Sequence, residues 1–234
     1  MTGQRGVALI LVVLVVTFLS AIGLGLALIV IVDHLATGNL RGSVAMLYAA
    51  DAALELAARD LALVEDWNLV LEGASRSSFV DGPAGGSRAI PGGGVVDLTA
   101  ATNLLNCGKA TPCTAAQMDA SSKERPWGAN NARWQLYAYG PFAGLGQLAR
   151  PAPCYLTVWV ADDRREEDAD PHKDAEAQGT PGHGVVRLRV EAYGPMGGRR
   201  AIEAELVRHC LPAGEGCRLR NRVQSWQEVR QTVP

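Results

Sequence analysis

The acidic segment at 162–176, DDRREEDADPHKDAE, contains the densest run of candidate metal ligands in the chain. Calcium takes about six to eight oxygen ligands, which acidic loops between strands can supply. The candidate ligands are Asp162, Asp163, Asp168, Asp170 and Asp174. The segment lacks the glycine and the glutamate of an EF-hand loop. Two interpretations stay open: a structural calcium site and, favoured here, a solvated charged loop that needs no cofactor.

Five cysteines follow the first hundred residues, at Cys107, Cys113, Cys154, Cys210 and Cys217. In an oxidising compartment the two closely spaced pairs could each close a short loop. We expect the disulfides Cys107–Cys113 and Cys210–Cys217, although five cysteines allow other pairings. Cys154 begins an apolar stretch and is expected to be a buried, inert thiol. A zinc site is disfavoured because no C-x2-C spacing occurs.

Other reactive residue types form no recognisable catalytic pattern in this sequence. The four histidines, at positions 34, 172, 183 and 209, lie in unrelated contexts, and G-x-S-x-G does not occur. The glycines at 92–94 follow a proline and do not link a strand to a helix, so they do not predict a phosphate site. We therefore expect a protein that is not an enzyme.

A basic stretch near the end of the chain is the one segment that could suggest nucleic acid. Arg218, Arg220 and Arg222 alternate as they would on one face of a strand, and Trp226 follows them. The net charge of −2 and the aromatic content of 6% give no general support for nucleic-acid binding. We expect an edge strand that its charges protect, and a nucleic-acid partner is disfavoured.

The elements that would position these residues begin with an apolar run at 7–32, which contains no charged side chain. As a helix it would extend roughly 39 Å at 1.5 Å per residue, longer than the ~30 Å hydrocarbon core of a bilayer. Arg5 precedes the run, and Asp33 and His34 follow it. The positive-inside rule then predicts a single-pass protein of the inner membrane, with a cytoplasmic N-terminus and the rest in the periplasm.

The helical pattern continues beyond the membrane run. Leu40, Leu47, Leu54 and Leu61 repeat every seven residues, and no proline occurs before Pro83. We expect one helix over 7–70, whose second part, 33–72, is amphipathic. Glycine and proline become frequent after residue 72, which indicates loops and turns.

The head at 73–234 contains four stretches that read as strands: 134–139, 155–161, 185–192 and 202–208. In the third, Val186 and Leu188 alternate with Arg187 and Arg189, as in an antiparallel strand with one solvated face. The stretch 97–106 fits either a short helix or a strand. The predicted fold class is α+β, a long N-terminal helix packed on a small antiparallel sheet.

The start of the chain resembles type IV pilin-like proteins. The hexapeptide MTGQRG at 1–6, followed by Val7, is similar to a leader peptide and its junction for prepilin peptidase. The resemblance implies cleavage after Gly6 and methylation of Val7. A second motif is similar to the helix pattern of PilX-type minor pilins, and 185–208 is loosely similar to a hairpin of those proteins. The motif consists of Asn39, Leu40, Arg41, Ala49, Ala50, Asp51, Ala52, Leu54 and Glu55.

Leu11 departs from the pattern of major pilins, which have a glutamate at this fifth position of the mature chain. In the family that carboxylate pairs with the amine of a neighbouring subunit, and an unpaired charge in an apolar core is costly. An apolar residue is typical of priming or tip subunits, such as the K-type pseudopilins of type II secretion. Those subunits also bind calcium in the head, which keeps the metal interpretation of 162–176 open.

The resemblance implies a non-enzymatic minor pilin that is stored in the inner membrane and moves into an extracellular filament. The implied partners are other major and minor pilins through the N-terminal helix, prepilin peptidase, the inner-membrane assembly platform, and lipid before assembly. The alternative is a signal-anchored periplasmic or surface binding protein that never polymerises.

Overall fold

The computed structural model describes residues 4–121, 133–145, 153–166, 170–174, 183–213 and 216–229. The chain divides into two compact units, one up to Gly42 and one from Ser43 onward. Helix α1, Gln4–Leu61, belongs to both units, and every other helix and strand lies in the second. The α+β class and the long N-terminal helix are confirmed.

Helix α1 ends at Leu61, earlier than the expected residue 70. A turn follows, and then a separate short helix, α2, Asn68–Leu71. Gly73, with a φ of +75°, lies just beyond its end. The Trp67 indole nitrogen donates a 3.0 Å hydrogen bond to the carbonyl of Leu61. The helix therefore stops where tertiary contacts satisfy its last carbonyls, although the local composition would allow it to continue.

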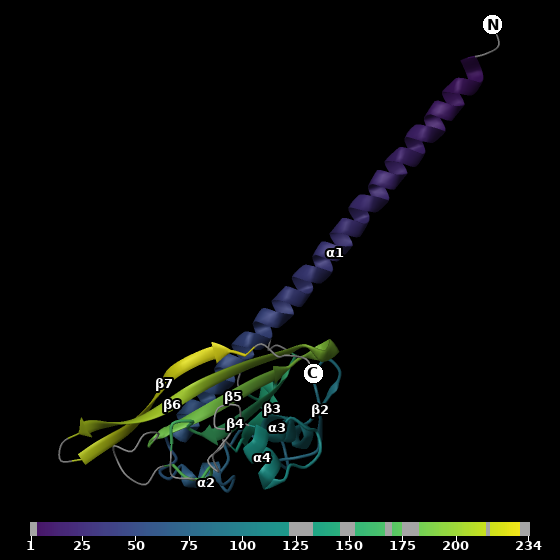
Figure 1. Ribbon diagram of the computed structural model, residues 1–234. Helices are drawn as coiled ribbons and strands as arrows, with labels where there is room; N and C mark the ends of the chain where they lie inside the picture. The colour runs from purple at the N-terminus through teal and green to yellow at the C-terminus, as the bar shows by residue number, and fades with distance from the viewer. Residues whose placement is uncertain are drawn as a thin grey trace. The chain divides into compact units, whose positions relative to one another are not determined.

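The main sheet is antiparallel and larger than expected, with five strands in the order β3-β4-β5-β6-β7 (Figure 1). The strands are β3 Gln135–Pro141, β4 Tyr155–Asp162, β5 Val185–Tyr193, β6 Arg199–Ala213 and β7 Gly216–Glu228. Each of the four predicted strands is present. The additional size comes from β7 and from the long β6, which pairs with β7 from Ile202 to Ala213.

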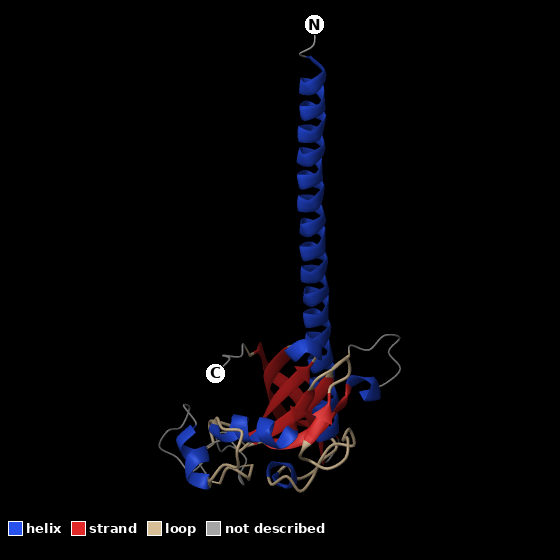
Figure 2. Cartoon of the chain, turned by 90° about the vertical axis from the view of Figure 1, so that its right-hand side faces the viewer, coloured by secondary structure: helices blue, strands red, loops and turns tan. Residues whose placement is uncertain are grey.

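Two hydrophobic clusters lie on opposite faces of this sheet. One contains Ala49, Ala50, Ala53 and Leu54 of α1 together with β4, β5 and β6 residues such as Val158. The small alanine side chains let the helix backbone approach the strands closely. Figure 2 shows the last turns of α1 beside the sheet, which is drawn in red. Burial of the amphipathic part of α1 therefore contributes to the hydrophobic cluster on this face of the sheet.

The other face of the sheet is covered by smaller elements. These are the hairpin of β1, Ser87–Ala89, and β2, Val95–Asp97, with helices α3, Leu98–Cys107, and α4, Ala115–Ser121; short 3-10 turns lie at Phe142–Leu145 and Pro195–Gly197. Asp97 caps α3, since its Oδ1 accepts a 2.8 Å bond from the Ala100 amide. The stretch 97–106, which fitted either a helix or a strand, is thus helical except for Asp97, the last residue of β2.

The expectation of a solvated face on β5 is wrong. Arg187 and Glu191, which point away from the α1 side, are as buried as their apolar neighbours. The reason is that the second cluster, which includes Trp134 and Trp159, covers this face as well. The alternating pattern of β5 therefore separates an apolar core from a buried ionic layer.

Candidate functional site

The apolar segment of α1, 7–32, is an exposed surface that needs a partner. All side chains from Val7 to Ala36 are exposed, and the segment carries no charge before Asp33. Within the described ranges, α1 is the one helix long and apolar enough to cross a membrane. The segment is consistent with a single-pass membrane anchor. Apolar surface of this extent must be covered by lipid or by protein.

Polar groups inside the apolar segment are satisfied by the helix itself. Thr17 donates from Oγ1 to the carbonyl of Leu14 at 2.9 Å, and Ser20 donates to the carbonyl of Val16 at 2.8 Å. Such bonds remove the cost of placing a hydroxyl in hydrocarbon. Leu11 lies on the exposed surface among other aliphatic side chains. The segment can therefore enter either a bilayer or a packed bundle of helices.

The helix motif of the PilX-like pattern divides between exposed and buried positions. Asn39, Leu40 and Arg41 are exposed in the first unit. In the second unit Ala49, Ala50 and Leu54 are buried against the sheet, whereas Asp51, Ala52 and Glu55 are exposed. Asp51 accepts a 3.2 Å hydrogen bond from the indole nitrogen of Trp226 on β7. The buried residues of the motif thus join the helix to the sheet, and Asp51 adds a contact with β7.

Several of the candidate calcium ligands are described by the structure, and two of them form ion pairs. Asp163 pairs with Arg165 at 3.1 Å, Asp170 pairs with Lys173 at 3.4 Å, and Asp162 is buried at the end of β4. Asp168 lies outside the described residues. In the ranges that the structure describes, no three His, Cys, Asp or Glu side chains converge as a metal ion requires.

Two hydrogen bonds of Asp174 connect the acidic segment to the rest of the head. Its Oδ1 accepts a 2.7 Å hydrogen bond from the Gly184 amide, and its own amide donates to Asn68 Oδ1 at 2.8 Å. Burial raises the pKa of Asp174, against the opposing effects of the Gly184 bond, His183 and Arg208. This carboxylate therefore has a structural role in the loop between β4 and β5.

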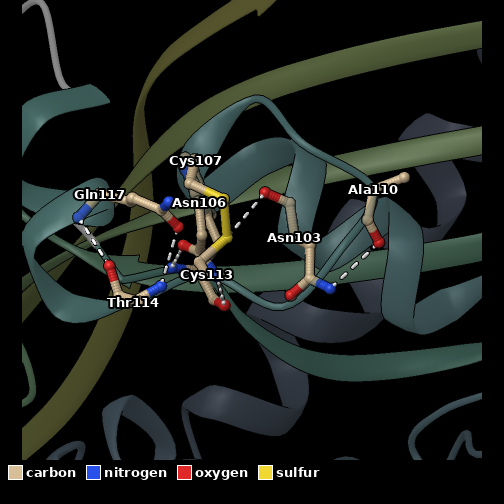
Figure 3. Close-up of a disulfide and its surroundings, with 8 residues drawn as sticks. Asn103, Asn106, Cys107, Ala110, Cys113, Thr114 and Gln117 are labelled. Atoms are coloured by element: carbon tan, nitrogen blue, oxygen red, sulfur yellow. Dashed lines mark hydrogen bonds between the residues drawn. A yellow bond between two sulfur atoms is a disulfide. The ribbon is translucent and has the colours of Figure 1, made fainter.

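One of the two predicted disulfides is confirmed. Cys107 at the end of α3 is bonded to Cys113, with the Cα atoms 6.0 Å apart. Figure 3 shows the bond beside Asn103, whose side-chain amide donates to the Ala110 carbonyl at 3.3 Å. The bridge and this hydrogen bond together close the loop after α3.

The other cysteines have different outcomes. The side chains of Cys210 and Cys217 lie outside the described part of the chain, and their pairing remains a prediction; the backbone register places Cys217 opposite Pro212. Cys154 is a free thiol and is completely buried, as expected. Burial raises its pKa to about 11, so the nucleophilic thiolate is scarce at neutral pH.

The contacts of Arg208 could not be anticipated from the sequence. Its guanidinium lies 3.9 Å from the ring centre of Trp67 and donates to the carbonyls of Leu61, Val64 and Glu65 at 3.2, 2.5 and 2.8 Å. Burial lowers the pKa of Arg208, and Asp174 and Asp66 oppose that effect. A strand residue thus caps the C-terminus of a helix that lies far from it in sequence.

A buried ionic layer on β5 and β6 is the second unanticipated feature. Arg189 bridges Glu191 at 2.8 Å and Glu203 at 2.5 Å, and Arg187 contacts Glu203 at 3.4 Å. Burial alone would lower the pKa of Arg189, but the two carboxylates outweigh it and raise the pKa. The opposite charges on adjacent strands were the available signal, since Arg189 is paired directly with Glu203.

Comparison with known proteins gives no relative for this chain. No family model, curated protein or solved structure matches it. Function must therefore be argued from the chain's own residues.

Proposed function

We propose that this chain is a minor subunit of a type IV pilus or related filament, similar to PilX-type minor pilins, which acts in assembly, in priming or at the tip. The observation that carries the proposal is helix α1, whose segment 7–32 is apolar and uncharged and whose last turns pack on an antiparallel sheet. The subunit has no enzymatic role. The head would act through its surface.

The physical basis of assembly is that the apolar segment never meets water. Before assembly it lies in the inner membrane, where all backbone groups of a helix are internally bonded. In the filament the same surface packs against the helices of other major and minor pilins. The side chains from Val7 onward are exposed on a continuous helix, so the same helix can contact lipid in the membrane or other subunits in the filament without changing its conformation.

Leu11 supports a place at the start or tip of the filament. A glutamate at this position would need an amine of the next subunit, since an unpaired charge in an apolar core is costly. With Leu11 the subunit enters the core without that requirement. We infer that the chain is stored with its head in the periplasm, interacts with the assembly platform, and is a minor rather than a bulk component.

The proposed processing is tested by the mass of the mature N-terminus. The full chain is co-expressed with a prepilin peptidase, purified from membranes in detergent, and analysed by peptide mass spectrometry. We expect a chain that starts at N-methylated Val7. Gly6→Leu should leave the precursor intact, whereas Gly3→Leu, a matched change inside the leader, should still be cleaved.

An intact Met1 on the wild-type chain, in cells where the peptidase cleaves another prepilin, would contradict the proposal. That result would favour the alternative, a signal-anchored periplasmic or surface protein that does not polymerise. Normal cleavage of Gly6→Leu would contradict the assignment of the junction.

A further inference from the structure

The two edges of the main sheet differ in whether their outer backbone groups are hydrogen-bonded to another segment. At the β3 edge the segment before β1 pairs with the strand: the Ser77 amide donates to Tyr137 at 3.1 Å, and the Tyr139 amide donates to Phe79 at 2.9 Å. At the β7 edge, no described strand pairs with the outer backbone. β7 is 13 residues long and contains no proline. Charged side chains and bulges commonly protect edge strands. β7 has exposed arginines and one register shift after Val223, so its outer backbone suits an added strand whose charges match the arginines.

The two faces of β7 differ in chemistry. Arg220 and Arg222 pair with His209 and Val207, are exposed, and lie on the face away from α1. On the α1 face, Val223 pairs with Leu206 of the core. A register shift follows, after which Trp226 returns to the α1 face with 46% of its surface exposed.

We propose that the outer edge of β7 binds an extended segment of a partner protein by strand addition, and that this segment alternates acidic and apolar residues. Side chains of a strand alternate between faces, so its acidic residues would lie beside Arg220 and Arg222. Its apolar residues would lie on the α1 face, toward Val223 and Trp226. The proposal stands whether or not the chain polymerises through α1.

Charge decides between an acidic partner and a second copy of the same edge. Two β7 strands that pair antiparallel, edge to edge, would bring the arginines of both copies onto one face, and like charges opposite each other are destabilising. An acidic strand gains cross-strand pairs at the same positions. Backbone hydrogen bonds supply affinity, and the arginines supply selectivity.

The test uses the full chain in detergent and a fluorescent synthetic peptide of alternating valine and glutamate, with binding measured by anisotropy. We expect saturable binding, with new hydrogen-exchange protection of β7 amides. The double variant Arg220→Glu/Arg222→Glu should bind the valine–glutamate peptide about tenfold more weakly, because the exposed charge pairs are lost and reversed. It should instead bind a second peptide, of alternating valine and lysine. Arg76→Glu, at another exposed arginine, should bind as the wild type does.

A backbone-methylated valine–glutamate peptide separates strand addition from simple charge attraction. It keeps the charge but loses the amide donors, so we expect no binding. Equal binding of the methylated peptide, unchanged binding by the double variant, or no binding of the parent peptide would each overturn the proposal. A folded double variant is verified by its unchanged thermal transition.

Discussion

The cap formed by Arg208 gives the sharpest prediction about the head. The change is Arg208→Met, which keeps an apolar side chain of similar length and removes the guanidinium. It deletes the three hydrogen bonds to the end of α1 and the stacking on Trp67. We expect a loss of stability without a change of fold, because α1 remains packed on the sheet through its alanine face.

The size of this stability loss depends on which hydrogen bonds the three carbonyls retain in Arg208→Met. The Leu61 carbonyl retains its bond from the Trp67 indole, and Glu65 is exposed, so water can replace the arginine there. The bond to Val64 then contributes most, about 1.5–3 kcal/mol for a charged donor, and the stacking contributes about 1 kcal/mol. Desolvation of the guanidinium, which lowers its pKa, offsets part of this. The net cost is about 2 kcal/mol.

The assay is thermal and urea unfolding of the full chain in detergent, compared with Arg222→Met, an exposed arginine on β7. Arg208→Met should lower Tm by about 4–8 °C, and the control should shift stability by less than about 0.5 kcal/mol. Arg208→Lys should recover only part of the loss, since a single ammonium cannot reach three carbonyls. Faster amide exchange should be confined to the last turn of α1. Equal stability of Arg208→Met and Arg222→Met would refute the capping argument.

Three further predictions concern Asp174 and the cysteines. Burial raises the pKa of Asp174 above its usual value, so the native state binds this proton more tightly than the unfolded state does. The wild type therefore loses stability as the pH rises from the unfolded pKa of Asp174 through its native pKa. Asp174→Asn should be at least as stable as the wild type at pH 7, and the difference between their urea midpoints should disappear in acid. Cys154, with a pKa of about 11 and no exposed surface, should resist iodoacetamide at pH 7 in the native chain and react after denaturation, as peptide mapping would reveal; rapid native labelling would contradict this. Replacing Cys107 and Cys113 by serine should lower the free energy of unfolding by about 2 kcal/mol for so short a loop, and an unchanged urea midpoint would mean that the bridge adds nothing.

The local features of the chain were predictable because they depend on neighbours in sequence. The apolar helix from Val7, the four strands and the Cys107–Cys113 bridge all follow from periodicity or short spacing. The burial of the charged side chains of β5 was not predictable. Alternation of apolar and charged residues, as at Val186 and Arg187, occurs both where the charged face is solvated and where it is covered. Only the packing of Trp134 and Trp159 over that face decides between them.

The same distinction applies to the functional features. The sequence by itself determined that an uncharged apolar segment covers 7–32 and that the helical turns after it are amphipathic, because helical periodicity depends on residues three and four positions apart. Tertiary structure alone decided that α1 stops at Leu61, that Asp174 binds Gly184 and Asn68, and that no described strand pairs with the outer edge of β7. Each of these depends on residues more than a hundred positions apart or on the order of strands in space. Sequence spacing does not encode such contacts.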